Sequence, residues 1–411
     1  MVTSTPQSPN IRPRPEDCSE GRATEVAAAF SRLGLTSFGG PIAHLGYFRR
    51  EFVERRKWLD EEHFGQLLAL CQFLPGPASS QLAFSLGLLR AGWLGGLAAF
   101  ACFTLPSALL LFALASSAQY LDGPLGQSVI HGLKLVAVAV VAQGVMAMAR
   151  TLTPDLARAF MAAAAAGLIL ISGSAWTQLL IVAGGATFGP WLCRRVLARR
   201  GETFALHYGR RTGSIFLALF GLLLISAFVI APDSPPLGQV AGAFYQTGAL
   251  VFGGGHVVLP LLKQAIVDRG WLGQDTFLAG YGAAQAVPGP MFTLAAFLGE
   301  RLNQGRGGVL GATISLLAIF LPGTLLVAGA LPFWRALGNH DQAARMLAGV
   351  NAVVVGLLAA AFYNPVWISA IRSPYDVAVA LVGFAMLVWA RWSPLVVVAW
   401  CVLASLTRVW I

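Results

Sequence analysis

The segment Gln72-Phe73-Leu74-Pro75-Gly76-Pro77 recurs later in the chain as Gln285-Ala286-Val287-Pro288-Gly289-Pro290. Both copies interrupt stretches that are otherwise apolar. Proline removes a backbone donor and clashes with the preceding helical turn, and a glycine between two prolines leaves the chain free to unwind. Each copy therefore predicts a helix that is broken inside an apolar segment.

Further matches around these two segments extend the similarity to most of the chain. At a shift of 213 to 217 residues, Phe38-Gly39-Gly40 aligns with Phe252-Gly253-Gly254, Trp58 with Trp271, Leu105-Pro106-Ser107 with Leu321-Pro322-Gly323, and Gly132 with Gly349. The common order and spacing indicate a duplication. We predict four parts: a disordered cytoplasmic tail (1–23), a first transporter repeat (24–200), a basic loop with a linker span (201–237) and a second transporter repeat (238–411).

The composition indicates an all-α integral membrane protein. The chain is 56% hydrophobic and only 11% charged, whereas a soluble domain carries roughly 25% charged residues. Too few charges remain to cover the surface of a soluble protein of 411 residues, so lipid must replace the missing polar surface.

Apolar stretches long enough to cross a bilayer can be marked along the whole chain. We predict about thirteen transmembrane segments: 24–46, 64–89, 92–118, 128–149, 156–173, 175–193, 212–231, 238–262, 276–299, 308–331, 344–363, 374–390 and 393–410. Each repeat holds six of them, and 212–231 is the linker span. Seven spans between corresponding points would turn the second repeat upside down, as in many secondary transporters.

Basic residues orient these segments, because cytoplasmic loops are rich in Lys and Arg. The N-terminal tail and the 194–211 loop are both basic, so we place both on the cytoplasmic side. The 47–63 loop then falls outside, although it holds Arg49, Arg50, Arg55, Arg56 and Lys57. A re-entrant 64–89 segment is the alternative, and it would change the orientation of everything that follows.

The formal charge of +10 does not indicate nucleic-acid binding, because the basic residues lie in short clusters between apolar runs. The five cysteines have no CxxC spacing, and we assign them neither disulfides nor a metal. We expect no cofactor. We find no Walker motif in the sequence, which argues against direct ATP hydrolysis.

The broken helices predict an anion site near mid-membrane. Interrupted helices are tolerated inside a bilayer only where they are buried in protein or line a polar cavity. Pro77 can begin a half-helix whose positive end carries hydroxyls and an amide, which suits an oxyanion. The candidate residues are Arg32, Phe38, Gly39, Gly40, Pro41, His44, Pro75, Gly76, Pro77, Ser79, Ser80, Gln81, Gly253, Gly254, Gly255, His256, Gln285, Pro288, Gly289 and Pro290.

Each type of candidate also has a structural interpretation. The Pro-Gly-Pro segments could be packing kinks, and the histidines could be hydrogen-bonded helix residues. Arg32 is a charge within an apolar segment, which favours a functional role, but it could also extend to the interface. We rank Lys134, Arg90 and Arg301 below Arg32, since they fall near segment ends. Few acidic residues lie deep in the spans, so the balance favours an anionic substrate.

These motifs resemble the chromate ion transporter family. The resemblance rests on Gly34-Leu35-Thr36-Ser37-Phe38-Gly39-Gly40-Pro41, Arg55-Arg56-Lys57-Trp58-Leu59, Leu74-Pro75-Gly76-Pro77, Phe252-Gly253-Gly254-Gly255-His256-Val257-Val258-Leu259-Pro260 and the second Pro-Gly-Pro segment. It implies a long-chain, two-domain protein of the inner membrane that exports chromate and confers chromate resistance. Met291-Phe292 departs from the polar residues of the first copy, so only the backbone is a candidate there.

Alternatives from other classes stay open. A general carrier for sulfate and other oxyanions would have the same architecture. A channel would conduct without coupling or saturation. A membrane enzyme would need clustered nucleophiles, bases or metal ligands, and the six scattered histidines do not supply them; we therefore predict a transporter rather than an enzyme. The sequence leaves open the coupling ion and whether the protein forms a homo-oligomer.

Overall fold

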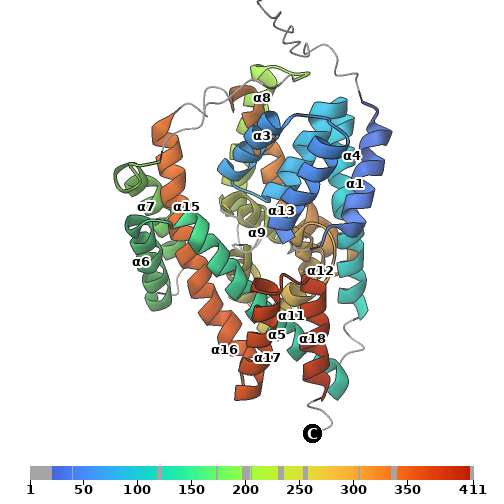
Figure 1. Ribbon diagram of the computed structural model, residues 1–411, viewed down its shortest axis with the longest axis vertical. Helices are drawn as coiled ribbons and strands as arrows, with labels where there is room; N and C mark the ends of the chain where they lie inside the picture. The colour runs from blue at the N-terminus through green and yellow to red at the C-terminus, as the bar shows by residue number, and fades with distance from the viewer. Residues whose placement is uncertain are drawn as a thin grey trace, which may run out of the picture.

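The structure is a computed structural model. It describes residues 21–38, 40–117, 123–172, 175–196, 204, 206–229, 236–252, 258–303, 306–334 and 340–407. Residues 1–20 of the expected tail and the run 253–257 lie outside these ranges. Within them every regular element is a helix (Figure 1).

The elements divide at the linker helix α8 (Arg210–Val229). Before it come α1 (Ala23–Thr36), α2 (Gly40–Phe48), η2 (Arg49–Arg55), α3 (Glu61–Phe73), α4 (Ala78–Ser117), α5 (Pro124–Leu152), α6 (Leu156–Ser172) and α7 (Ala175–Leu192). After it come α9 (Pro236–Leu250), α10 (Val258–Leu262), η5 (Lys263–Val267), α11 (Gln274–Ala284), η6 (Met291–Thr293), α12 (Leu294–Glu300), α13 (Gly308–Ala330), η7 (Leu331–Phe333), α15 (Asp341–Ala361), η8 (Phe362–Trp367), α16 (Ile368–Ala370), α17 (Pro374–Val388) and α18 (Pro394–Thr407).

Helix α4 consists of two antiparallel parts, 78–90 and 93–117. Ala91 and Gly92 between them have non-helical backbone angles, and Gly92 has φ +60°. The two parts pack so closely that a Cβ on Gly87 would overlap the carbonyl oxygen of Gly95. The chain therefore reverses direction at Gly92.

The segments 23–55 and 61–90, which we call the N-terminal hairpins, both begin and end at one end of the molecule. Glu25, in the first turn of α1, accepts hydrogen bonds from the Trp58 indole at 3.0 Å and from Arg90 at 3.3 Å. The Arg56 guanidinium lies 3.7 Å from the same carboxylate. Each hairpin thus enters the molecule, breaks and returns.

The corresponding segments of the second half, 236–252 with 258–267 and 274–300, are called the C-terminal hairpins. Arg306 donates to Gln239, near the start of α9, at 3.2 Å, and its guanidinium lies 4.9 Å from the centre of the Trp271 ring. Asn303 N–H donates to the Trp271 carbonyl at 3.0 Å. We call the end at which a pair of hairpins begins and ends its mouth. Each mouth is thus closed by a tryptophan, an arginine and the start of the first helix of that half.

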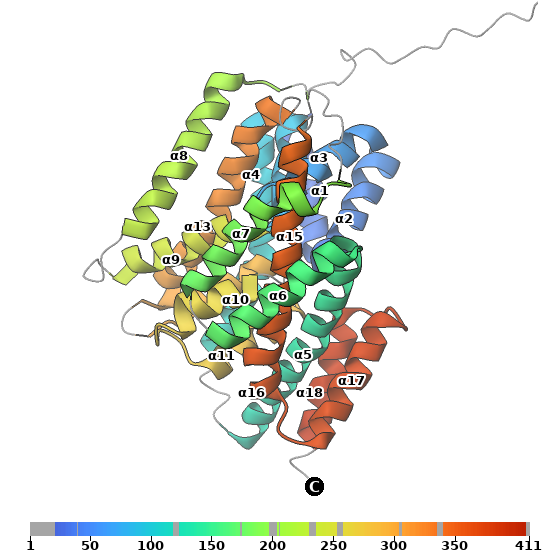
Figure 2. The ribbon, with the colours of Figure 1, turned by 90° about the vertical axis from the view of Figure 1, so that its left-hand side faces the viewer.

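The two mouths lie at opposite ends of two long helices. The second part of α4 starts beside Arg90, and Ser116 near its end hydrogen-bonds Glu300 at 3.4 Å. Helix α13 starts just after Arg306, and beyond its end the Trp334 indole donates to Gln66 of α3 at 3.2 Å. At 1.5 Å per residue, helices of this length span about 35 Å. Figure 2 shows α3 above α11 along the long axis.

The remaining helices interlock the two halves. Helix α5 packs on α17 and α18 of the second half, and α15 packs on α6 and α7 of the first. Close approach needs small residues: a Cβ on Gly132 would lie 2.7 Å from the Cα of Val402, and Gly349 faces Gly185. The two halves therefore exchange packing partners and form one interlocked unit.

Five helices of the described chain are long and apolar enough to cross a membrane: Ala78–Ser117, Leu125–Leu152, Arg210–Val229, Gly308–Phe333 and Asp341–Ala370. Leu222, Ile225 and Phe228 on the linker helix are half or more exposed, as expected for side chains in lipid. The chain is a multi-pass membrane protein.

The structure differs from the expected crossings at 24–46, 64–89, 238–262 and 276–299, so it does not confirm the count of thirteen. Each stretch is long enough in total, but the helices on either side of its break have at most 15 residues, including the first part of α4. The expectation that the 47–63 loop lies opposite the N-terminal tail was wrong, because Arg56 contacts Glu25. The hairpin formed by α3 and the first part of α4 agrees with the alternative of a re-entrant 64–89 segment.

The close contact between α9 and α13 gives a prediction about stability. A Cβ on Gly248 would overlap the carbonyl oxygen of Ile319, whereas Gly221 on α8 has no neighbour within 4 Å. We expect Gly248→Val to destabilise the protein by about 1–3 kcal/mol or more, because the helices must separate. The Gly221→Val control should unfold in detergent at the wild-type temperature. Equal unfolding temperatures for both variants would contradict the tight α9–α13 contact.

Candidate functional site: the crossing of the two Pro-Gly-Pro turns

The two Pro-Gly-Pro turns meet the opposite half of the protein by equivalent hydrogen bonds. Gly76 N–H donates to the carbonyl of Val251, at the end of α9, at 2.7 Å, and Gly289 N–H donates to the carbonyl of Ser37, at the end of α1, at 2.9 Å. Both glycines have positive φ, +122° and +100°, a conformation that favours glycine. Each broken helix thus satisfies its backbone in the other half.

Each turn also packs against a proline-containing helix of the other half. A Cβ on Gly76 would lie 3.0 Å from the Cα of Gly323 in α13, and a Cβ on Gly289 would lie 2.8 Å from Ser107 Oγ in α4. Gln81 Nε2 bridges the first contact, donating to the Pro75 carbonyl at 2.9 Å and to the Gly323 carbonyl at 3.2 Å. Each turn therefore lies against one of two helices, α4 and α13, that pack on each other, and we call this region the crossing.

Polar atoms without a hydrogen-bond partner gather on the elements of the first half that form this crossing. His44 Nε2–H donates to the Ser37 carbonyl at 3.2 Å, which leaves Nδ1 as an unpaired acceptor. Within the described residues, the buried side-chain atoms there that lack a partner are Ser37 Oγ, His44 Nδ1, Ser80 Oγ, Gln81 Oε1 and Thr104 Oγ1. Leaving such groups unpaired is costly, so a polar ligand would be stabilised by them.

The second half contributes fewer unsatisfied groups. Thr293 donates to the Pro290 carbonyl at 2.6 Å, and Thr247 donates to the Ala243 carbonyl at 2.9 Å, each within its own element. Gln285 is buried, and its amide nitrogen donates to the Met291 sulfur at 3.2 Å. A thioether is a weak acceptor, so this amide keeps most of its capacity to donate to a ligand. The two half-sites differ chemically.

Several predicted site residues lie at the crossing or beside it. Ser37 and Phe38 follow the end of α1, and Gly40 begins α2, whose first turn contains Pro41. Phe38 is half-buried, and Ser79 is buried in the first turn of α4. The residues that the crossing brings together are His44, Pro75, Gly76, Pro77, Ser80, Gln81, Gln285, Pro288, Gly289 and Pro290. Gly39, Gly253, Gly254, Gly255 and His256 lie outside the described residues.

Arg32 is not brought to the crossing. The buried residues of α1 are Val26, Ala29, Phe30, Leu33 and Gly34, and Arg32 lies on the exposed face. Lys134 in α5, ranked lower from the sequence, is instead 2% exposed. It is the only lysine or arginine among the buried residues of the described chain. The sequence signal for Lys134 was its position inside an apolar segment, where a charged residue is a functional candidate by default.

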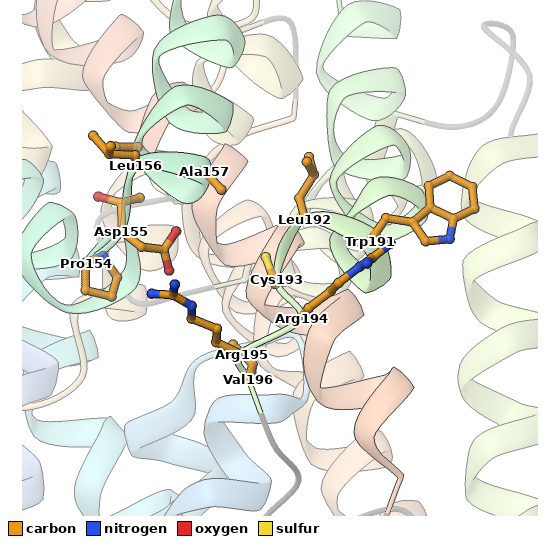
Figure 3. A pocket seen from close by; sticks show the side chains of 12 residues that line it. Pro154, Asp155, Leu156, Ala157, Trp191, Leu192, Cys193, Arg194, Arg195 and Val196 are labelled. Carbon is orange, nitrogen blue, oxygen red and sulfur yellow. The ribbon is translucent and has the colours of Figure 1, made fainter.

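A separate pocket of about 720 Å³ lies where α6 begins and α7 ends (Figure 3). It is lined by Asp155, Trp191, Arg194 and Arg195, among others. Asp155 accepts hydrogen bonds from the Arg158 side chain and backbone, which hold the pKa of its carboxyl below the ordinary value. The pocket shares no lining residue with the crossing.

Broken helices, interlocked halves and polar groups deep between apolar helices are the features of a membrane transporter. Residues 24–190 and 238–406 of the chain match the family model described as "chromate transporter". The chain belongs to this chromate transporter family. The two matched regions coincide with the segments before and after the linker helix α8, so each half is one copy of the family unit.

Three relatives with assigned names agree with this result. The chain is 30% identical over 370 residues to a probable chromate transport protein of Synechococcus elongatus, covering 89% of this chain and 88% of the relative. It is 28% identical to chromate transport proteins of Cupriavidus metallidurans and Pseudomonas aeruginosa, covering 87% and 85% of this chain and 85% and 82% of those relatives. No solved structure matches the chain.

The crossing predicts that Gly76 tolerates a side chain less well than a glycine with the same backbone requirement elsewhere. Gly76 and Gly92 both have positive φ, but a Cβ on Gly76 would meet Gln81 and Gly323 within 4 Å, whereas a Cβ on Gly92 would meet open space. Gly76→Ala should abolish most transport, while Gly92→Ala should retain clearly more at equal amounts of folded protein. Chromate uptake into vesicles, normalised to folded protein, measures this. If Gly92→Ala were the more damaging change, backbone strain rather than the crossing would explain the effect.

Proposed function

We propose that the protein exports chromate from the cytoplasm across the inner membrane and thereby confers chromate resistance. Membership of the chromate transporter family and the names of three relatives support chromate as the substrate. The observation that carries the site is the crossing of the two Pro-Gly-Pro turns. It places hydroxyl and amide groups between the two halves, where a transporter of this architecture holds its substrate.

The chemistry of the crossing favours an oxyanion over a cation. Its unpaired groups include the hydroxyls of Ser37, Ser80 and Thr104, which can donate to an oxygen of the substrate. Among the buried residues of the described chain the only carboxylate is Asp376 of α17, and the His131 imidazole and the Ser373 hydroxyl both hydrogen-bond it. The positive end of the half-helix that begins at Ala78 adds to this preference.

Alternating access is the mechanism that we propose. The mouth of the N-terminal hairpins lies with the basic 49–57 loop, and Arg194 and Arg195 follow α7; the positive-inside tendency puts this end in the cytoplasm. The C-terminal hairpins open toward the other end, which supports an inverted pair of repeats over 24–200 and 238–411. Rocking one pair of hairpins against the other would expose the crossing to each side in turn.

The membrane potential favours export. Moving one negative charge out of a cell that is negative inside releases about 2.3 kcal/mol per 100 mV, and chromate carries two such charges. Export of the dianion can therefore proceed without ATP, and exchange with a proton or another anion would add to this driving force.

A general carrier for sulfate and related oxyanions is the second candidate. Chromate and sulfate are both tetrahedral dianions, and backbone and hydroxyl donors do not by themselves distinguish them. A membrane enzyme or a channel would need features for which neither the crossing nor the family gives support.

The proposal predicts saturable uptake of radiolabelled chromate by inside-out vesicles that contain the protein. Uptake should resist an excess of sulfate and should fall when the electrical potential is collapsed. Collapsing the proton gradient separately tests proton coupling. Uptake abolished by sulfate would establish the general carrier instead, and uptake no greater than in empty vesicles would refute transport of chromate.

A further inference from the structure

Helix α5 carries a buried lysine whose partner lies on a C-terminal hairpin. The Lys134 ammonium lies 2.5 Å from a carboxylate oxygen of Asp275, in the first turn of α11. The lysine side chain is 2% exposed, whereas that of Asp275 is 64% exposed. The charge thus lies inside the protein, and its neutralising partner lies at the mouth of the hairpin.

This ion pair is close to the element that leads into the second Pro-Gly-Pro turn. The carbonyl of Leu133, the residue before Lys134, touches α11 at Gly282 so closely that a Cβ there would overlap it. Gln285, with its poorly paired amide, lies one turn further along α11. The long flexible stem of a lysine allows its ammonium to reach outward to Asp275 or to turn inward toward Gln285.

The fold does not require a cation at this position. In the other repeat, the residue that aligns with Lys134 is Asn351, and the residue that aligns with Asp275 is Glu62. Asn351 Oδ1 is buried without a partner, and Glu62 is exposed. The corresponding helix α15 therefore packs in the second half with no charge at the position aligned with Lys134. A charge that packing does not need, in a protein that moves a dianion, suggests a role in binding.

We propose that Lys134 is the cation that binds the transported oxyanion, and that Asp275 holds its ammonium until the substrate replaces the carboxylate. This inference rests on the proposed function. Substrate and Asp275 compete for one ammonium group, so oxyanion binding breaks the pair that ties α5 to the mouth of the C-terminal hairpins. Binding of the substrate and opening of that end are thereby coupled.

The competition gives opposite expectations for the two partners. In Lys134→Gln the charge-assisted contact is lost, and the half-saturating chromate concentration should rise by about 10-fold or more. In Asp275→Asn the competitor is lost, and that concentration should fall several-fold while the maximal rate falls as well, because release of the anion becomes slower. The charge reversal Lys134→Asp with Asp275→Lys should not restore transport.

Chromate uptake into inside-out vesicles and the rise in unfolding temperature caused by chromate in detergent measure these effects. His131→Asn is the matched control, because it removes another ion pair of α5, the 2.9 Å contact with Asp376; we expect lower stability and an unchanged half-saturating concentration. Restored transport in the charge reversal, or an unchanged half-saturating concentration in Lys134→Gln, would overturn the inference and leave the proposed function intact. No transport by the wild-type protein would instead refute the proposed function, and the inference with it.

Discussion

The N–H groups of Gly76 and Gly289 are the constraint on which the rest of the structure depends. Each lies in a helix break deep inside a membrane protein, where lipid offers no acceptor. Gly76 N–H donates to the carbonyl of Val251 and Gly289 N–H to that of Ser37, each just after the first helix of the opposite half. Neither half can therefore satisfy its own break, and the two copies of the duplicated unit are stable only together.

The close packing of the molecule follows from this exchange. For the turns to reach the opposite half, α1 must approach the second part of α4 and α9 must approach α13. Gly34 and Gly248 permit both approaches, because a Cβ on either would overlap a carbonyl oxygen of the facing helix. The exchange of α5 and α15 between the halves extends the same interlocking to the ends of the molecule. Rigid hairpins held by small residues are suited to move as units.

The sequence predicted the breaks, the duplication and the family, because proline, glycine and repeated spacing are local signals. It offered a hairpin only as the alternative for 64–89, since hydropathy measures apolar length and cannot tell one crossing helix from two short helices that return. The basic residues from Arg49 to Lys57 were the signal that contradicted a crossing. The exposure of Arg32 could also have been predicted, because the apolar residues Val26, Ala29, Phe30 and Leu33 define the opposite, buried face of the helix. The pairing of Lys134 with Asp275 could not have been predicted from the sequence, because the two residues are distant in the chain.

We propose that two copies of one hairpin unit face opposite sides of the membrane and that each Pro-Gly-Pro turn bonds to the other copy. Arg55 and Asp268 occupy the same position in the two copies, and their side chains are 56% and 43% exposed. Single cysteines at these positions, in a protein whose five natural cysteines are replaced by alanine, can be labelled with a membrane-impermeant maleimide. We predict that Arg55→Cys reacts only in inside-out vesicles and Asp268→Cys only in right-side-out vesicles. Reaction of both from the same side would contradict the account.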